Sequence, residues 1–302
     1  MIRTLLPPAA GLAASPLLFA VINRTKAFFA GRRGPPLLQP YFDLWKLLQK
    51  GATYSRTTTW VFRAGPVVGL ACSATALLLL PWGNLPALVA FPGDFVLFAY
   101  LLSVGRFFTV LAALDTGSSF EGMGASREVF FSALSEPALF LGLAAVAVRT
   151  RTLCLSEMVG AISPSAWAAE GPSLVLVCAA LFAVLLAENA RIPVDDPTTH
   201  LELTMIHEVM VLDHSGPDLA FIQWGAAVKL WLFGSLLVGL AVPVRTGDAW
   251  LDGAAFAAGM LAVAVLVGVV ESCMARVRLV RVPVLILGAA ALTVVALVLV
   301  VR

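Results

Sequence analysis

Long runs of uncharged, apolar residues recur along the whole chain, and short polar segments separate them. Each run approaches the roughly 20 residues that a helix needs to cross a bilayer. A barrel strand would be about half as long and would alternate in polarity, so the runs indicate helices. The pattern predicts an all-α polytopic membrane protein with about eight transmembrane helices, over residues 5–22, 64–80, 95–114, 129–148, 172–187, 221–242, 253–270 and 283–301.

The composition supports this picture and leaves little room for anything else. Of the 302 residues, 60% are hydrophobic and 13% are charged, and the mean hydropathy is +0.94. A soluble domain has about 25% charged residues, so a water-soluble enzyme is excluded. We expect one integral membrane domain over residues 1–302. The net charge of +2 gives no reason to expect a nucleic-acid partner.

The lysines and arginines predict how the chain is oriented. Most of them fall in the segments that follow the first, third, fifth and seventh expected helices. Basic residues are enriched in cytoplasmic loops. We therefore expect these four segments to face the cytoplasm and both termini to lie on the other side of the membrane.

The first of these segments contains an amphipathic pattern. Tyr41, Leu44, Trp45 and Leu48 recur at helical spacing, and polar residues occupy the other positions. This spacing predicts a short helix that lies in the membrane interface. The alternative is a plain connector whose cations only hold the topology.

The second and third segments are rich in acidic residues, which do little for topology and so need another explanation. The second contains Asp115, Glu121, Arg127 and Glu128, and the third contains residues 188–202 followed by Glu208, Asp213 and Asp218. These residues pair with the basic first segment, bind a soluble partner, or gather protons. Charge alone does not choose among the three.

Local signals explain part of this acidity. Thr199 and Glu202 have the spacing of a capping box, and Asp196 before Pro197 suits the start of a helix. Each of these residues either begins a helix or takes part in function.

The histidines and cysteines give little reason to expect a metal. His200, His207 and His214 are spaced by seven and share one helical face if a helix continues through them. His207-Glu208 lacks the second histidine of a metalloprotease motif, so pairing with carboxylates is the favoured role. The four cysteines lie far apart without a C-x-x-C motif, so we expect this chain to bind no cofactor.

Five ionisable residues fall within or at the edge of the expected helices: Arg106, Glu136, Glu188, Lys229 and Glu271. A charge at the centre of a membrane helix costs about 2.5–3.5 kcal/mol on insertion scales. Arg106, Lys229 and Glu271 avoid this cost if they lie near the interface. Glu136 lies well inside its run and precedes a proline. We predict that Glu136 and Glu188 exchange protons.

Three ordered motifs resemble the signature loops of the respiratory complex I subunit 1 family. They are residues 31–50, 124–128 and 187–203, and the resemblance in helix number and loop order extends over essentially the whole chain. Residues 195–208 are most similar to the membrane subunit of formate hydrogenlyase and hydrogenase-4, the group 4 membrane-bound [NiFe] hydrogenases. Thr198 and His200 stand where quinone-reducing relatives usually have acidic residues, which fits the hydrogenase branch.

The resemblance implies a non-catalytic membrane anchor and coupling subunit in the inner membrane of a prokaryote. It would dock a [NiFe]-hydrogenase-like large subunit and a small iron–sulfur subunit, contact antiporter-like membrane subunits, and link redox chemistry to proton or sodium translocation. The [NiFe] centre and the iron–sulfur clusters would then lie in the partners. The alternatives are the quinone-binding subunit of a complex I-like enzyme, a free-standing secondary transporter, and a purely structural anchor.

The resemblance also indicates which residues carry these roles. Arg127, Glu136, Glu188, Arg191, Pro193, Asp195, Pro197 and Glu202 match family positions in the motifs. We predict a proton path through Glu136, Glu188, Asp195 and Glu202. We predict that the docking and chamber loops use Arg32, Arg33, Tyr41, Trp45, Asp115, Glu121, Arg127, Arg191, Asp196, His200, His207 and Glu208.

Overall fold

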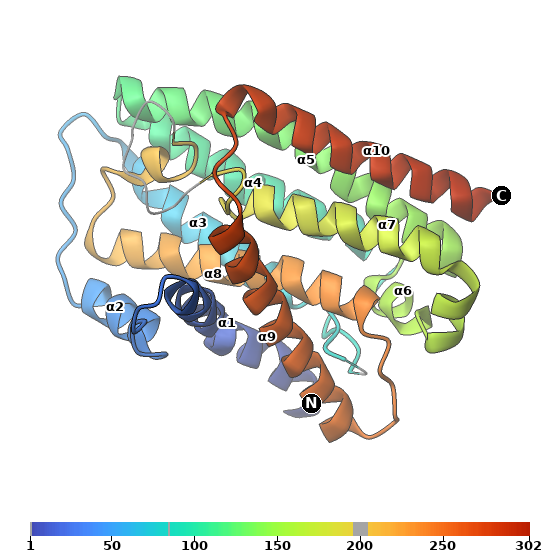
Figure 1. Cartoon of the computed structure of the whole chain (residues 1–302). Helices are drawn as coiled ribbons and strands as arrows, with labels where there is room; N and C mark the ends of the chain where they lie inside the picture. Colours follow the sequence, from blue (N-terminus) through green and yellow to red (C-terminus); the bar gives the residue numbers. More distant parts are fainter. Residues whose placement is uncertain (1, 84, 196–204) are drawn as a thin grey trace.

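The computed structural model describes residues 2–83, 85–195 and 205–302, and within these ranges the chain is a bundle of helices (Figure 1). The long helices lie side by side, and several of them are tilted with respect to one another. Their bounds are α1 (Ile2–Phe29), α3 (Trp60–Leu77), α4 (Asp94–Asp115), α5 (Ser119–Thr150), α7 (Pro164–Glu188), α8 (Gly216–Ala241), α9 (Ala249–Cys273) and α10 (Val282–Val301). Shorter elements are α2 (Gln39–Leu48), α6 (Leu155–Ala161), and the 3-10 turns η1 (Glu208–Val211) and η2 (Leu279–Arg281).

The all-helical membrane fold predicted from the sequence is confirmed. Among the described residues, seven helices are long and apolar enough to cross a membrane: α3, α4, α5, α7, α8, α9 and α10. The first expected span corresponds to α1, whose 28 residues extend about 42 Å at 1.5 Å per residue. α1 packs against both α8 and α9.

The two ends of the chain lie at the same end of the bundle. In Figure 1 the start of α1 and the end of α10 are at one end, and α2 is at the opposite end. This arrangement is what an even number of crossings produces. Which end faces the cytoplasm stays a prediction from the distribution of basic residues.

Two helices, α5 and α7, begin eight or more residues before the apolar runs that predicted them. α5 starts at Ser119 and not near residue 129, so Glu121 and Glu128 are helical and not part of a loop. α7 starts at Pro164 and is kinked at Glu170, and the short helix α6 precedes it. Hydropathy underestimates such helices, because polar residues are tolerated in a membrane helix that faces protein.

Gly124 lies at a position of α5 where a side chain would not fit. It lies inside the helix, and a Cβ there would come within 2.3 Å of Val209 Cγ1. The missing side chain allows the turn η1 to lie directly against α5. This contact brings the segment after residue 205 close to the polar face of α5.

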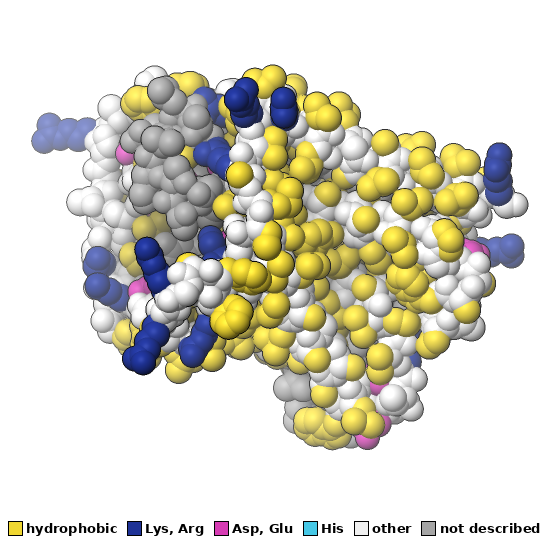
Figure 2. Space-filling view, in the orientation of Figure 1, with side chains coloured by type: hydrophobic (Ala, Val, Ile, Leu, Met, Phe, Trp, Pro, Cys, Tyr) yellow, Lys and Arg dark blue, Asp and Glu magenta, His cyan; other side chains and the backbone are white. Residues whose placement is uncertain are grey.

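α8 lies in the interior of the bundle. It contacts α1, α2, α3, α7 and α9, and most of its side chains are buried, including Trp231 and Phe233. The outer faces of α9 and α10 remain apolar and exposed, as lipid contact requires. Figure 2 shows this hydrophobic surface, with most of the visible lysine and arginine side chains gathered toward the end of the bundle that carries α2.

The amphipathic helix predicted in the first polar segment is present as α2. None of its residues is buried, and Trp45 is 65% exposed. The Tyr41 hydroxyl donates a hydrogen bond of 2.7 Å to the Ala13 carbonyl oxygen of α1. The helix is therefore held to the bundle while its Trp45 face remains free.

Candidate functional site

Arg106 of α4 is surrounded by three carboxylates that come from two other helices. Its Nε lies 3.1 Å from Glu128 Oε1, its Nη1 lies 2.5 Å from Glu136 Oε1, and its Nη2 lies 2.5 Å from Glu188 Oε2. The Ser103 hydroxyl also donates a 2.8 Å hydrogen bond to Glu136 Oε1. Every nitrogen of the guanidinium therefore has a carboxylate partner.

Glu188 joins this group to α8. Lys229 Nζ lies 2.8 Å from Glu188 Oε2, and the Ser135 hydroxyl donates a hydrogen bond to the other oxygen. Because Glu188 is the last residue of α7, its side chain reaches across to α4, α5 and α8 at once.

His207 extends the group toward the segment that follows α7. Its Nε2 lies 2.9 Å from Glu128 Oε2, and its Nδ1 lies 3.7 Å from Asp195 Oδ2. Asp195 is held in place by the backbone amides of Ile206 and His207 and by Arg276 Nη2 at 2.8 Å. We call the connected set the Arg106 cluster: Arg106, Glu128, Glu136, Glu188, Asp195, His207, Lys229 and Arg276.

The helical register of α5 explains how one helix supplies two of the carboxylates. Glu128, Ser135 and Glu136 are spaced at i, i+7 and i+8, so they share one face. Glu128 is buried, whereas the Glu136 side chain is 36% exposed. The cluster therefore runs from a buried interior to the lateral surface of the bundle.

Among the described residues, the charges of the Arg106 cluster balance when it binds one proton. Arg106, Lys229 and Arg276 supply three positive charges, and Glu128, Glu136, Glu188 and Asp195 supply four carboxylates. Uncompensated charge in a buried site is costly. One proton on His207 makes four charges of each sign.

The surroundings of His207 favour that proton. Burial by itself would lower the pKa of His207, but Glu128 and Asp195 raise it to about 9. Burial likewise opposes ionisation of Asp195, yet its contacts with His207 and Arg276 hold the pKa of the carboxyl below its usual value. Both effects place the proton on His207 at neutral pH.

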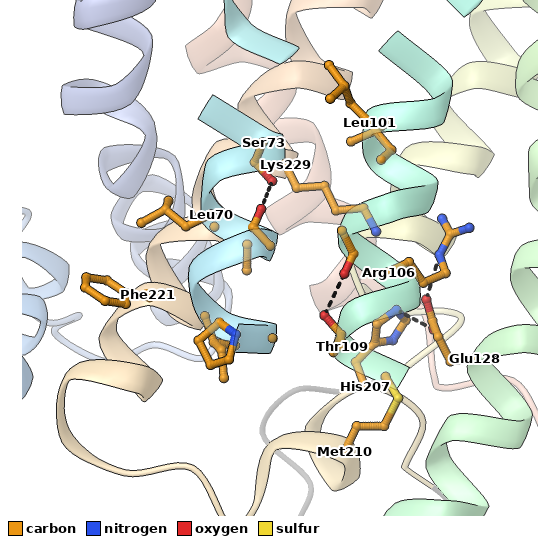
Figure 3. A pocket seen from close by; sticks show the side chains of 18 residues that line it. Leu70, Ser73, Leu101, Arg106, Thr109, Glu128, His207, Met210, Phe221 and Lys229 are labelled. Atoms are coloured by element: carbon orange, nitrogen blue, oxygen red, sulfur yellow. Dashed lines mark hydrogen bonds and ion pairs between the residues drawn. The ribbon is translucent and has the colours of Figure 1, made fainter. Parts of the chain in front are cut away.

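A cavity of about 150 Å³ adjoins the cluster between α3, α4 and α8. Figure 3 shows Arg106 and His207 both reaching Glu128 at its wall, with Lys229 and Thr109 nearby. A water needs about 10–15 Å³ of such space, so the cavity has room for several waters beside the titratable groups. Apolar side chains, including Leu70, Leu101, Met210 and Phe221, form much of the remaining wall.

Arg191 belongs to a separate charged group. Its Nη1 lies 3.3 Å from Glu271 Oε1, and Lys26 Nζ of α1 lies 2.9 Å from Glu271 Oε2. Burial lowers the pKa of Arg191, and Glu271 opposes that effect. This group ties α1 and α9 to the segment after α7, and only three residues, Ile192 to Val194, separate Arg191 from Asp195 of the Arg106 cluster along that segment.

Four of the site residues predicted from the sequence belong to the Arg106 cluster: Glu136, Glu188, Asp195 and His207. The side chains that connect them were not among the predicted site residues. Arg106 and Lys229 were interpreted as interfacial cations and Glu128 as a loop residue, yet each pairs with a carboxylate or histidine of the cluster. A usable signal was present, because an arginine and a lysine in apolar runs need buried anionic partners.

Other predicted residues hold local structure near the cluster. Asp115 accepts hydrogen bonds from the Thr59 amide and hydroxyl at the start of α3. Glu121 is buried and accepts from the Asp213 amide at 3.2 Å, and Arg127 Nη1 donates to the Met205 carbonyl oxygen at 2.8 Å. The contacts of Glu121 and Arg127 anchor residues 205–213 on α5.

The remaining predicted residues lie outside the cluster or outside the described residues. Arg32 and Arg33 are exposed in the turn after α1, Tyr41 and Trp45 belong to α2, and Glu208 begins η1. Asp196, His200 and Glu202 lie outside the described residues, and so do both helix-start signals predicted at 196–197 and 199–202.

The histidines were expected to share one face if a helix continued through them, and that condition is not met for the described pair. The six residues between His207 and His214 include the 3-10 turn η1, and no α-helix runs through both histidines. His214 instead stacks on Phe62 of α3, with ring centroids 3.9 Å apart, and burial lowers its pKa to about 4. The two imidazoles therefore differ in charge at neutral pH.

Comparison with known proteins identifies the family. The NADH dehydrogenase family model matches residues 5–301. Formate hydrogenlyase subunit 4 of Escherichia coli (strain K12) is 30% identical over 279 residues, which cover 88% of each chain. Hydrogenase-4 component C of the same organism is 31% identical over 229 residues, covering 76% of this chain and 71% of that protein.

More distant relatives agree. A subunit of the NADH-quinone oxidoreductase of Rubrobacter xylanophilus is 30% identical over 195 residues, covering 64% of this chain and 57% of that protein. A chain in the structure of the membrane-bound sulfane sulfur reductase, an archaeal respiratory membrane complex, has the same fold, with a TM-score of 0.82 at 21% identity and 98% coverage of both chains. The chain belongs to the NADH dehydrogenase family, that of respiratory complex I subunit 1, and is a multi-pass membrane subunit of a hydrogenase-like or complex I-like respiratory complex.

Proposed function

We propose that this chain is the membrane anchor and coupling subunit of a formate hydrogenlyase-type, group 4 [NiFe]-hydrogenase complex. It docks the soluble electron-transfer arm and links redox chemistry there to proton translocation. The longer match to formate hydrogenlyase subunit 4, at 88% of the chain against 64% for the quinone oxidoreductase subunit, supports the hydrogenase branch.

The observation that carries the coupling role is the path of contacts through the Arg106 cluster. It leads from Asp195 and His207, beside the polar segment after α7, through Glu128 and Arg106 to Glu136. Glu136 is the member whose carboxylate reaches the lateral surface, where it is 36% exposed. A titratable group at such a position needs water or a polar partner.

The same geometry supports a sequence of events. A change of charge in a docked partner near Asp195 and His207 alters how strongly His207 holds its proton. Loss of that proton leaves the cluster with one excess negative charge, which favours proton uptake by another carboxylate, such as Glu188 or Glu136. Release from Glu136 then delivers a proton to the neighbouring membrane subunit.

In this proposal the electrons remain in the partner subunits. The [NiFe] centre would lie in the large subunit and the iron–sulfur clusters in the small subunit, and antiporter-like subunits would cover the membrane face near Glu136. This chain supplies the docking surface and the groups that hold the proton.

Mild extraction tests the proposed assembly. The chain is purified by an affinity tag in a mild detergent, and the copurifying subunits are identified by mass spectrometry. The proposal predicts a [NiFe]-type large subunit, an iron–sulfur subunit and antiporter-like chains. Recovery of the chain as an oligomer of itself would overturn it.

A second candidate is the quinone-binding subunit of a complex I-like enzyme. The cavity beside Arg106 and His207 favours it, because that cavity combines an apolar wall with polar groups that suit a quinone carbonyl. A photoreactive quinone analogue tests it. Labelling of Tyr41–Leu48 or residues 195–207 would support this candidate, and labelling spread evenly over the lipid-facing helices would count against it.

A further inference from the structure

An open groove runs along the outer surface where the last turns of α1 meet α9. Its volume is about 440 Å³, and it is separate from the Arg106 cluster and its cavity. Val21, Phe28 and Phe29 of α1 line one wall, and Val265 and Val269 of α9 line the other. Phe28 is 80% exposed, so an apolar side chain stands uncovered at one edge.

The turn after α1 completes the groove. The Arg32 amide donates a hydrogen bond of 2.9 Å to the Ala27 carbonyl oxygen, so the chain folds back along the helix that it has just left. Gly34 packs on Arg24 and Ala27, where a Cβ would lie 3.3 Å from Arg24 Cα. This close approach brings Leu37 into the lining of the groove.

Three arginines lie in the lining of the groove or in the turn that folds back on α1 beside it. Arg24 is part of the lining, and Arg32 and Arg33 lie in the exposed turn that folds back on α1. Within residues 2–83, 85–195 and 205–302, none of these three arginines forms an ion pair, whereas Lys26 on the same turn of helix pairs with Glu271. Figure 2 shows lysine and arginine side chains beside the hydrophobic surface, toward the end of the bundle that carries α2.

We propose that this groove binds a phospholipid with an anionic headgroup. One acyl chain lies between Phe28 and Val265, where its methylene groups cover the exposed apolar walls. The phosphate and the headgroup charge lie against Arg24, Arg32 and Arg33. Guanidinium groups suit this role because they bind phosphate oxygens in a bidentate manner.

The number of cations determines how strongly the groove should prefer an anionic over a zwitterionic headgroup. Each basic residue near a membrane surface strengthens binding to anionic lipid about fivefold. Three arginines therefore predict at least a tenfold preference for an anionic over a zwitterionic headgroup, even if their effects add incompletely. The lipid would fasten α1 to α9 beside the Lys26–Glu271 ion pair.

Site-specific photolabelling tests the proposal on the purified assembly reconstituted in bilayers. The probes are phosphatidylglycerol and phosphatidylcholine that carry a diazirine on one acyl chain, and labelled peptides are mapped by mass spectrometry. At equal concentration, phosphatidylglycerol should label residues 21–29 and 261–270 at least ten times more than phosphatidylcholine does. Equal labelling by the two lipids would overturn the proposal.

Matched variants separate headgroup recognition from general lipid contact. The triple variant R24Q/R32Q/R33Q should bring the labelling ratio to within about twofold of unity, while K46Q/K50Q, in and just after α2, should keep the full preference. Val265→Trp should reduce labelling by both lipids, because it fills the apolar wall. A preference that survives the arginine substitutions would contradict the assignment, and so would absence of any lipid label in the groove.

Thermal unfolding serves as the control for these variants. The three arginines are exposed and form no ion pair among the described residues, so their replacement should leave the unfolding temperature at its wild-type value. The labelling ratio is then a property of the groove and not of a misfolded chain.

Discussion

Arg106 Nη2 and Glu188 Oε2 lie 2.5 Å apart, although 82 residues separate them along the chain. The pair joins α4 to the end of α7, and the side chains are only 9% and 5% exposed. Arg106 binds two further carboxylates of α5 through its other nitrogens. A single guanidinium therefore holds three acidic groups together within the membrane domain.

Replacing Arg106 should be strongly destabilising. Arg106→Met leaves three neighbouring carboxylates without their shared cation, and loss of one partner from a buried ion pair costs about 3–5 kcal/mol. Unfolding of the detergent-purified chain measures the effect. Arg149→Met is the matched control, because Arg149 pairs with Glu170 at a site where both side chains are about a third exposed, and it should cost about 1 kcal/mol or less. Equal losses in the free energy of unfolding of the two variants would contradict the conclusion that Arg106 holds the three carboxylates together.

His207 should make stability depend on pH in the alkaline range. Its pKa of about 9 lies above the ordinary value of 6.5, so the folded state holds the proton more tightly than the unfolded state does. The resulting stabilisation, of about 3 kcal/mol, is fully present below pH 6.5 and is lost as the pH rises through 9.

Unfolding measured between pH 6 and 10 tests this prediction. The wild type should lose stability across that range, and His207→Gln should show a flatter profile that begins from a lower value. His214→Gln is the matched control, since burial holds His214 neutral at these pH values, and it should leave the slope unchanged. A wild-type profile that stays flat up to pH 10 would rule out a protonated His207.

The contact between α5 and η1 predicts opposite effects at two glycines. Gly124→Ala places a methyl group 2.3 Å from Val209 Cγ1, which should cost about 1–3 kcal/mol. Gly122→Ala meets no atom within 4 Å and should stabilise the helix by about 0.5–1 kcal/mol. Unfolding of both variants and of G124A/V209A measures this, and the double variant should recover part of the loss. If the double variant recovers no stability, Val209 does not set the distance between α5 and η1.

Tyr41 should control how firmly α2 is held to α1. Tyr41→Phe removes the hydrogen bond to the Ala13 carbonyl oxygen, which is worth about 0.5–1.5 kcal/mol. Hydrogen exchange should therefore speed up in Gln39–Leu48 by roughly two- to tenfold. Trp45→Phe, which changes an exposed side chain, should leave exchange in this segment unaffected, and faster exchange in that control would point to a different anchor for α2.

The helices and two acidic residues of the site could be predicted from the sequence, because both signals depend on residues that lie close together along the chain. Apolar runs mark the helices, and Glu136 and Glu188 stand out as carboxylates in those runs. The start of α5 was missed because hydropathy does not register a polar turn that is buried by protein. The role of Arg106 was missed because it depends on three carboxylates 22, 30 and 82 residues away, and only the packing of α4, α5 and α7 brings them together.

The proton path is tested most directly by counting protons translocated per electron pair in Glu136→Gln. The intact complex is reconstituted in proteoliposomes and compared with wild type and with Glu170→Gln, a carboxylate of similar exposure that pairs with an arginine outside the cluster. Because Glu136 links the buried cluster to the lateral surface, we predict that E136Q assembles and transfers electrons but translocates few or no protons, while E170Q behaves as wild type. An unchanged ratio of protons to electrons in E136Q would contradict the proton path.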